Sequence, residues 1–110
     1  MTEASLQIAI LQALRFACPK AEVYAIPLGG SRNPIEGANL KRQGVRAGVA
    51  DLCVILPGKV GWIEVKTEKG RLTAAQKDFA GLCKQYAIPH CIARSIDDAI
   101  TAVRAWSATP

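Results

Sequence analysis

The sequence lacks the segments that place a chain in or across a membrane. None of its apolar runs approaches the roughly 18 residues that a membrane-spanning helix needs. The N-terminal stretch MTEASLQ contains an acid and has no basic region of the kind that begins a signal peptide. Repeats, linkers and low-complexity tracts are also missing, and 110 residues is the length of one domain. We therefore expect one globular domain, residues 1–110, in the cytoplasm.

Cysteine and histidine are too scattered to indicate a zinc site or a catalytic triad. The four cysteines form no CxxC pair, and the single histidine, His90, lies at the start of an apolar run. The segment GGSRNP follows a predicted strand but lacks the spacing of a dinucleotide-binding or Walker motif, so no nucleotide cofactor is expected. The cysteines are expected to remain reduced and to pack as small hydrophobic side chains (Cys18, Cys53, Cys83 and Cys91).

Basic residues exceed acidic residues, and several of them gather in one segment. Fourteen Lys and Arg against nine Asp and Glu give a net charge of +5, which weakly favours a polyanionic partner. Between residues 32 and 46 the only acid is Glu36. This segment either contacts phosphates or is a solvated loop, and composition alone does not separate the two. Its basic residues are Arg32, Lys41, Arg42 and Arg46.

Hydrophobic periodicity predicts an αβββαβα order. Thr2 and Thr73 are plausible N-caps of the first two helices, and Ser95 of the third. The strand–helix–strand unit follows an antiparallel hairpin, so we expect a mixed central sheet flanked by helices. Residues 29–48 show little periodicity and are expected to form a long loop, and the final SATP is expected to fray. The predicted helices are 4–17, 74–86 and a third from residue 96, and the predicted strands are 22–28, 50–56, 60–67 and 88–94.

The hairpin GVADLCVILPGKVGWIEVKTEKG places three charges among apolar residues. Side chains alternate across a strand, so Glu64 and Lys66 share one face. A two-residue connection at Pro57-Gly58 sets Asp51 opposite Glu64, whereas a four-residue connection sets it opposite Lys66. Both registers bring the three charged side chains within reach of one another.

Two such arrangements of charge are reasonable. One is a cross-strand ion pair between Lys66 and either carboxylate. The other is a metal site, because two neighbouring carboxylates repel unless a proton or a cation lies between them. Carboxylate oxygens and water suit Mg²⁺ or Mn²⁺. The arrangement as a whole, with a basic segment upstream, favours the metal site formed by Asp51 and Glu64, with Lys66 acting on a bound water.

The same residues resemble a nuclease family. G-V-x-D followed by I-E-V-K-T-x-x-G-R-L-T-x-x-Q looks like the stand-alone, virus-type VRR-NUC nucleases of the PD-(D/E)XK superfamily, and the resemblance extends over nearly the whole chain. It implies a restriction-endonuclease-like core, a Mg²⁺ or Mn²⁺ cofactor and hydrolysis of DNA phosphodiesters. It also implies a homodimer acting on branched DNA such as Holliday junctions, in a bacterial cell or phage-infected host.

The resemblance also assigns roles to individual residues. Asp51, Glu64 and the carbonyl of Val65 match the metal ligands, and Glu3 matches an acid that approaches the metal directly or through water. Lys66 matches the catalytic lysine. Gln76 matches a glutamine near the active site, but Thr73-Ala-Ala-Gln76 is also a capping box, and the two roles are compatible. Outside the metal site, Arg71 is expected to lie in a turn, and a contact with phosphate is a second role for it.

Overall fold

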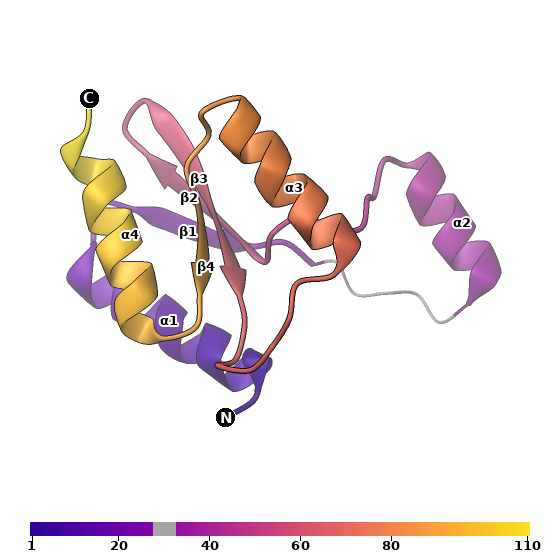
Figure 1. The fold of residues 1–110 in the computed structure, drawn as a ribbon, viewed down its shortest axis with the longest axis horizontal. Coiled ribbons are helices and arrows are strands. Elements are labelled where there is room, and N and C mark those ends of the chain that lie inside the picture. The colour runs from indigo at the N-terminus through magenta and orange to yellow at the C-terminus, as the bar shows by residue number, and fades with distance from the viewer. Residues whose placement is uncertain (28–32) are drawn as a thin grey trace.

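A mixed four-stranded sheet with helices on both faces forms the body of the molecule (Figure 1). The structure is a computed structural model that describes residues 1–27 and 33–110. The sheet order is β1-β2-β3-β4, with antiparallel pairing up to β3 and parallel pairing between β3 and β4, as predicted. The elements are α1 (Glu3–Ala17), β1 (Glu22–Ala25), α2 (Pro34–Arg42), β2 (Leu52–Leu56), β3 (Lys59–Val65), α3 (Ala74–Gln85), β4 (His90–Ala93) and α4 (Ile96–Ala108).

Helices α1 and α4 pack side by side and cover one face of the sheet. The four-residue spacing of Leu6, Ile10 and Leu14 predicted the buried side of α1, and all three side chains are buried. From α4, Ala99 and Val103 complete this layer. Because strand side chains alternate, every second residue of the hairpin enters the same core. These strand residues are Leu52, Val54, Leu56, Ile63 and Val65.

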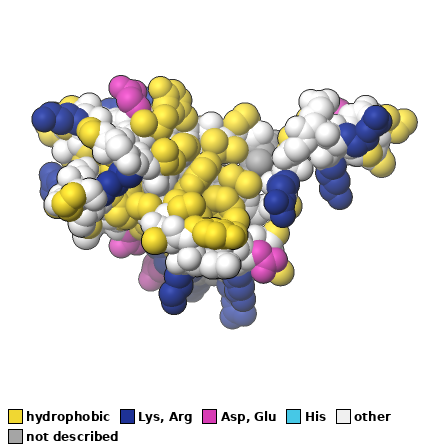
Figure 2. Space-filling view, turned by 90° about the horizontal axis from the view of Figure 1, so that it is seen from above, with side chains coloured by type: hydrophobic (Ala, Val, Ile, Leu, Met, Phe, Trp, Pro, Cys, Tyr) yellow, Lys and Arg dark blue, Asp and Glu magenta, His cyan; other side chains and the backbone are white. Residues whose placement is uncertain are grey.

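The opposite face of the sheet carries α3. Phe79 of α3 packs edge-on against Trp62 of β3, with 5.3 Å between ring centroids, and its ring also lies 6.0 Å from that of His90. Cys83 is buried, but the apolar side chains of Leu82 and Tyr86 are 46% and 63% exposed. Figure 2 shows hydrophobic side chains at the surface across the middle of the molecule, between the part with the C-terminus and the projecting α2.

The expected long loop between β1 and β2 contains a helix, so the observed order is αβαββαβα. Asn33 caps α2, its side-chain oxygen accepting from the Ile35 amide at 2.9 Å, and Pro34 occupies the first turn. Lys41 and Arg42 stand in the last turn, where positive charge is favourable. The helix has no buried residue and projects from the body (Figure 1), so no apolar periodicity marks it in the sequence.

The hairpin between β2 and β3 takes the two-residue connection. Leu56 pairs with Lys59 and Leu52 pairs with Ile63. Gly58 has a φ of +74°, a conformation that glycine adopts without strain and that the third position of a Pro-Gly turn requires. Of the two registers that the sequence left open, the structure has the one that sets Asp51 beside Glu64.

The C-terminal residues are more ordered than the sequence indicated. Ser107 and Ala108, expected to fray, continue α4. Lys59 Nζ donates to the carbonyl oxygens of Trp106 at 2.9 Å and Thr109 at 2.7 Å, and to Thr109 Oγ1 at 2.7 Å. A long-range lysine therefore supplies the positive charge that the last turn of α4 lacks.

No helix within residues 1–27 and 33–110 is long and apolar enough to cross a membrane.

Candidate active site

The register of the hairpin brings Asp51 and Glu64 together on the α3 face of the sheet. Leu52 pairs with Ile63, and continuing by one residue sets Asp51 opposite Glu64. Asp51 Oδ2 accepts a hydrogen bond from the amide of Val65 at 2.7 Å. The Asp51 side chain thus extends the hydrogen bonding between β2 and β3 beyond the last backbone pair, Leu52 with Ile63. Lys66 follows on the same face as Glu64 because side chains alternate.

Glu64 and Lys66 are the buried charged residues of the described chain, at 2% and 6% exposure. Burial raises the pKa of Glu64 from 4.5 to about 8, and its hydrogen bond with Asp51 and the negative charge of Asp51 add to that rise. The positive charge of Lys66 lowers this pKa, and the negative charge of Glu3 raises it by a smaller amount. The two carboxyl groups are therefore close enough to share a proton.

Gln76 of α3 completes a capping box and also contacts Glu64. Its side-chain Oε1 accepts from the backbone N–H of Thr73 at 2.9 Å. Its backbone N–H donates to Thr73 Oγ1 at 3.1 Å, and the two bonds together form a capping box. Its Nε2 donates to Glu64 Oε2 at 3.4 Å. Because Oε1 must accept from a backbone N–H, the amide has only one orientation, and that orientation turns Nε2 toward Glu64.

The segment before Asp51 lies directly against the start of α3. Gly48 has a φ of +90°, and a Cβ at this position would be 2.2 Å from the carbonyl oxygen of Ala75. Ala50 is fully buried, and the carbonyl of Asp51 accepts from the Ile26 amide at 2.8 Å. Close backbone packing on one side and the β1 edge on the other thus fix the position from which Asp51 reaches Glu64.

The donor set fits a divalent cation. Burial is the largest cause of the raised pKa of Glu64 and Asp51 adds to it, so a cation between the two carboxylates would favour their ionised forms. The Val65 N–H points at Asp51, and since the N–H and C=O of one strand residue lie along the same edge, its carbonyl is a third oxygen on that side. Within the described chain no group of three or more His, Cys, Asp and Glu side chains is placed to hold an ion. Any remaining positions would be filled by water, and the expected contribution of Glu3 stays a prediction.

The basic residues expected to contact DNA lie on segments other than the strands β2 and β3. Lys41 and Arg42 are exposed at the end of α2, and Arg46 is exposed in the segment that returns to β2. Arg71 is exposed between β3 and α3, in the expected turn region. Arg32 lies outside the described residues. The arm formed by α2 carries Lys and Arg side chains at its surface in Figure 2.

The cysteines and the histidine have no part in this site. All four cysteines are free, as expected. Burial raises the pKa of the Cys53, Cys83 and Cys91 thiols, that of Cys91 to about 11, which keeps them protonated and unreactive. Burial lowers the pKa of His90, whose ring packs with Phe79.

Comparison with solved structures identifies the fold of the chain. No family model matches the chain, and no curated protein matches it. A solved structure of a VRR_NUC domain protein superposes with a TM-score of 0.75, covering 96% of this chain and 88% of that one at 21% identity. The chain has the VRR-NUC fold. This confirms the fold that the GVAD and IEVKT motifs suggested, and the VRR-NUC fold here includes the mixed sheet that joins Asp51, Glu64 and Lys66.

Proposed function

We propose that the protein is a Mg²⁺- or Mn²⁺-dependent endonuclease that hydrolyses DNA phosphodiester bonds. The observation that carries this proposal is the pair of partly buried Asp51 and buried Glu64, in which burial and the neighbouring Asp51 raise the pKa of Glu64 to about 8, with buried Lys66 beside it on a VRR-NUC fold. A buried acid next to a second acid destabilises a protein, and a cation-binding role gives the two acids a use. A module that only bound DNA would gain from losing both acids, since they repel phosphate.

Each residue of the site has a distinct part in this proposal. Asp51, Glu64 and the Val65 carbonyl would hold the cation, which would stabilise negative charge on the phosphate and lower the pKa of a bound water. Lys66 holds the attacking water and offsets charge on the phosphate. As the water oxygen bonds to phosphorus, the bond to the leaving sugar oxygen breaks, the water releases a proton to solvent and the sugar oxygen takes one up from solvent. Gln76 orients Glu64, and Glu3 adds negative charge near the cation.

The basic arm provides the expected DNA contacts. Lys41 and Arg42 are exposed at the end of α2, the helix that projects from the body (Figure 1), and Arg46 is exposed after it, so they are available to the backbone of a duplex whose cleaved phosphate lies at the carboxylates. Arg32 and Arg71 belong to the same expected set. We propose selection by DNA shape, on branched substrates such as Holliday junctions, since the motifs resemble nucleases of this type.

A homodimer accounts for paired cuts in a symmetric junction. The exposed Ile35 on the projecting α2, at 74% exposure, and the exposed side of α4 supply surfaces on which a second copy can pack. Size-exclusion chromatography with light scattering tests this: a mass of about twice the 11.7 kDa of the chain is expected, and a monomer at micromolar concentration contradicts it.

Cleavage assays on defined substrates test the activity. Four-way junctions, flaps, nicked duplexes and linear duplexes are each incubated with the protein and Mg²⁺ or Mn²⁺. The four-way junction is expected to be cleaved at the highest rate. Lys66→Ala is expected to lower the rate by about a hundredfold or more. Lys84→Ala, which removes an exposed lysine from the last turn of α3, serves as the matched control. Junction binding that is indifferent to Asp51→Ala, with no cleavage and no metal uptake, would identify a non-catalytic binding module instead.

A further inference from the structure

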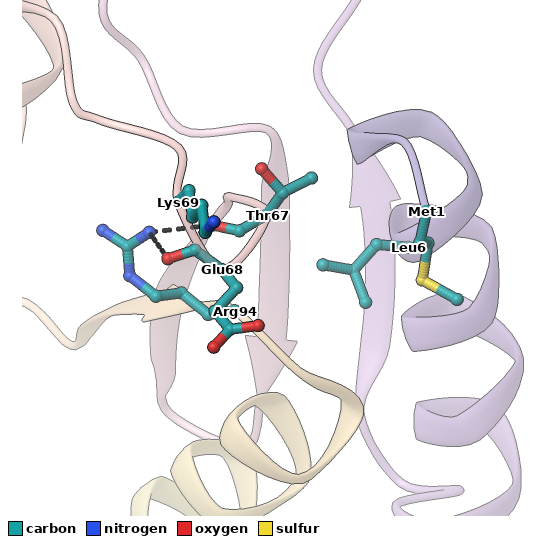
Figure 3. A pocket seen from close by; sticks show the side chains of 6 residues that line it. All are labelled: Met1, Leu6, Thr67, Glu68, Lys69 and Arg94. Atoms are coloured by element: carbon teal, nitrogen blue, oxygen red, sulfur yellow. Dashed lines mark hydrogen bonds between the residues drawn. The ribbon is translucent and has the colours of Figure 1, made fainter.

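One guanidinium nitrogen binds three carbonyls of the segment that follows the candidate catalytic lysine. Arg94 Nη1 donates to the carbonyl oxygens of Thr67 at 2.8 Å, Glu68 at 3.3 Å and Gly70 at 2.6 Å. Figure 3 shows the Arg94 side chain reaching from the end of β4 to this segment. The amide of Gly70 also donates to the Thr67 carbonyl at 3.0 Å, so residues 67–70 form a tight turn around the guanidinium.

This turn lies against the stem of Lys66. A Cβ on Gly70 would be 3.4 Å from Lys66 Cδ and 3.2 Å from Thr67 Oγ1, so the space between the turn backbone and the lysine stem is about that of one methyl group. Lys66 is only 6% exposed, and its positive charge lowers the pKa of Glu64. The turn therefore provides part of the wall that holds the lysine stem.

Arg94 is itself anchored on two sides. Between the parallel strands β3 and β4, the Lys66 backbone N–H donates to the carbonyl of Ala93 at 3.0 Å. This bond fixes the backbone immediately before Arg94. Its backbone amide donates to Asp98 Oδ2 at 2.9 Å, and Asp98 lies in the first turn of α4. The guanidinium thus extends from a fixed backbone, which suits it to define the position of another segment.

We propose that Arg94 is a positioning residue for Lys66. By binding the carbonyls of Thr67, Glu68 and Gly70, the guanidinium keeps the turn closed over the lysine stem, and the closed turn directs the ammonium toward Glu64. The three carbonyls converge on one terminal nitrogen, Nη1, at the end of a side chain that reaches from β4 to the turn. A pocket of about 410 Å³ adjoins the turn and leaves room for the segment to move when the guanidinium is absent.

This inference rests on the proposed function for its catalytic consequence, but the position of Lys66 is measurable without it. Acylation of amines with an N-hydroxysuccinimide ester, followed by peptide mass spectrometry, reports how accessible each lysine is. In Arg94→Ala the labelling rate of Lys66 is expected to rise about fivefold or more as the turn opens, with that of Lys77 unchanged. Arg104→Ala, which removes an exposed arginine from α4, is the matched control and leaves Lys66 protected. Unchanged Lys66 labelling in Arg94→Ala overturns the proposal.

Cleavage kinetics separate positioning from direct contact with DNA. In Arg94→Ala the rate at saturating junction is expected to fall about tenfold or more while the half-saturating DNA concentration changes less than about threefold. Arg94→Lys is expected to retain an intermediate rate, and millimolar methylguanidinium to restore part of the Arg94→Ala rate. A loss confined to DNA affinity, or an unchanged saturating rate, overturns a positioning role. If the wild-type protein cleaves no substrate, the proposed function fails, and the labelling result alone decides whether Arg94 positions Lys66.

Discussion

Gln76 Nε2 lies 3.4 Å from Glu64 Oε2 while Oε1 of the same amide caps α3. A single side chain thereby ties the start of a helix to a carboxyl group on the neighbouring strand. The bond to Thr73 settles which end of the amide faces Glu64, so the helix cap also determines that the carboxyl meets a donor rather than an acceptor. Local helix chemistry and the candidate active site are coupled through this residue.

Substitution at the two ends of the capping box separates these roles. Gln76→Ala and Thr73→Ala each remove one capping bond, so each is expected to lower the free energy of unfolding by about 0.5–2 kcal/mol. Only Gln76→Ala removes the donor from Glu64, and it is expected to slow junction cleavage about tenfold, with Thr73→Ala within about twofold of wild type. Urea denaturation and single-turnover cleavage provide the two measurements. Equal rates in the two variants would show that the contact with Glu64 is unimportant.

Metal-free protein is expected to become less stable as the pH rises from about 4.5 to about 8. Folded Glu64 keeps its proton up to about pH 8, whereas the unfolded chain releases it near 4.5. Between these values the folded state binds more protons than the unfolded state, so the free energy of unfolding falls with pH, by roughly 2–5 kcal/mol in total. Below 4.5 the contribution is fully present, and above about 8 it has been lost.

Urea denaturation in EDTA across this pH range measures the effect. Glu64→Gln, which resembles the protonated carboxyl, is expected to remove most of the slope, and Glu68→Gln, at an exposed position, to retain it. Added Mn²⁺ is expected to restore stability most strongly near pH 8, because the cation competes with the proton. Parallel pH profiles for wild type and Glu64→Gln would contradict this assignment.

The alternation of side chains along a strand was sufficient to predict which charges share a face, but it did not determine the register of the hairpin. Asp51, Glu64 and Lys66 lie on one side of the sheet with either even-numbered connection, and the structure has the two-residue turn in which Leu56 pairs with Lys59. A Pro-Gly pair favours a type II turn over the primed turns typical of two-residue hairpins, so turn preference alone did not decide between them.

Two features escaped prediction for different physical reasons. Helix α2 buries none of its residues, so its sequence contains caps and terminal charges but no hydrophobic period. Arg94 lies 24 or more positions along the chain from the carbonyls that it binds, and only the parallel pairing of β3 with β4 brings them together. A backbone carbonyl has no residue type, so no sequence motif marks the partners of Arg94.

Gly48 and Gly44 provide a test of close packing beside Asp51. Both have positive φ, +90° and +97°, but a Cβ at Gly48 would be 2.2 Å from the Ala75 carbonyl oxygen, and one at Gly44 meets nothing within 4 Å. Gly44→Ala is expected to cost about 1 kcal/mol from backbone strain alone. Gly48→Ala is expected to cost about 3 kcal/mol or more, since the segment must also move away from α3. Urea denaturation compares the two, and similar losses would rule out tight packing at Gly48.

Lys59 is expected to stabilise the C-terminal turn of α4. Its ammonium binds the Trp106 and Thr109 carbonyl oxygens at 2.9 and 2.7 Å, and the Thr109 hydroxyl also donates to the Trp106 carbonyl at 3.1 Å. Lys59→Met keeps the aliphatic stem and removes the charge, so a loss of about 1–2 kcal/mol is expected, together with faster amide exchange in the last turn of α4. Lys77→Met, at an exposed position of α3, is expected to change stability by less than about 0.5 kcal/mol. If both variants unfold at the same urea concentration, the ammonium does not hold the end of the helix.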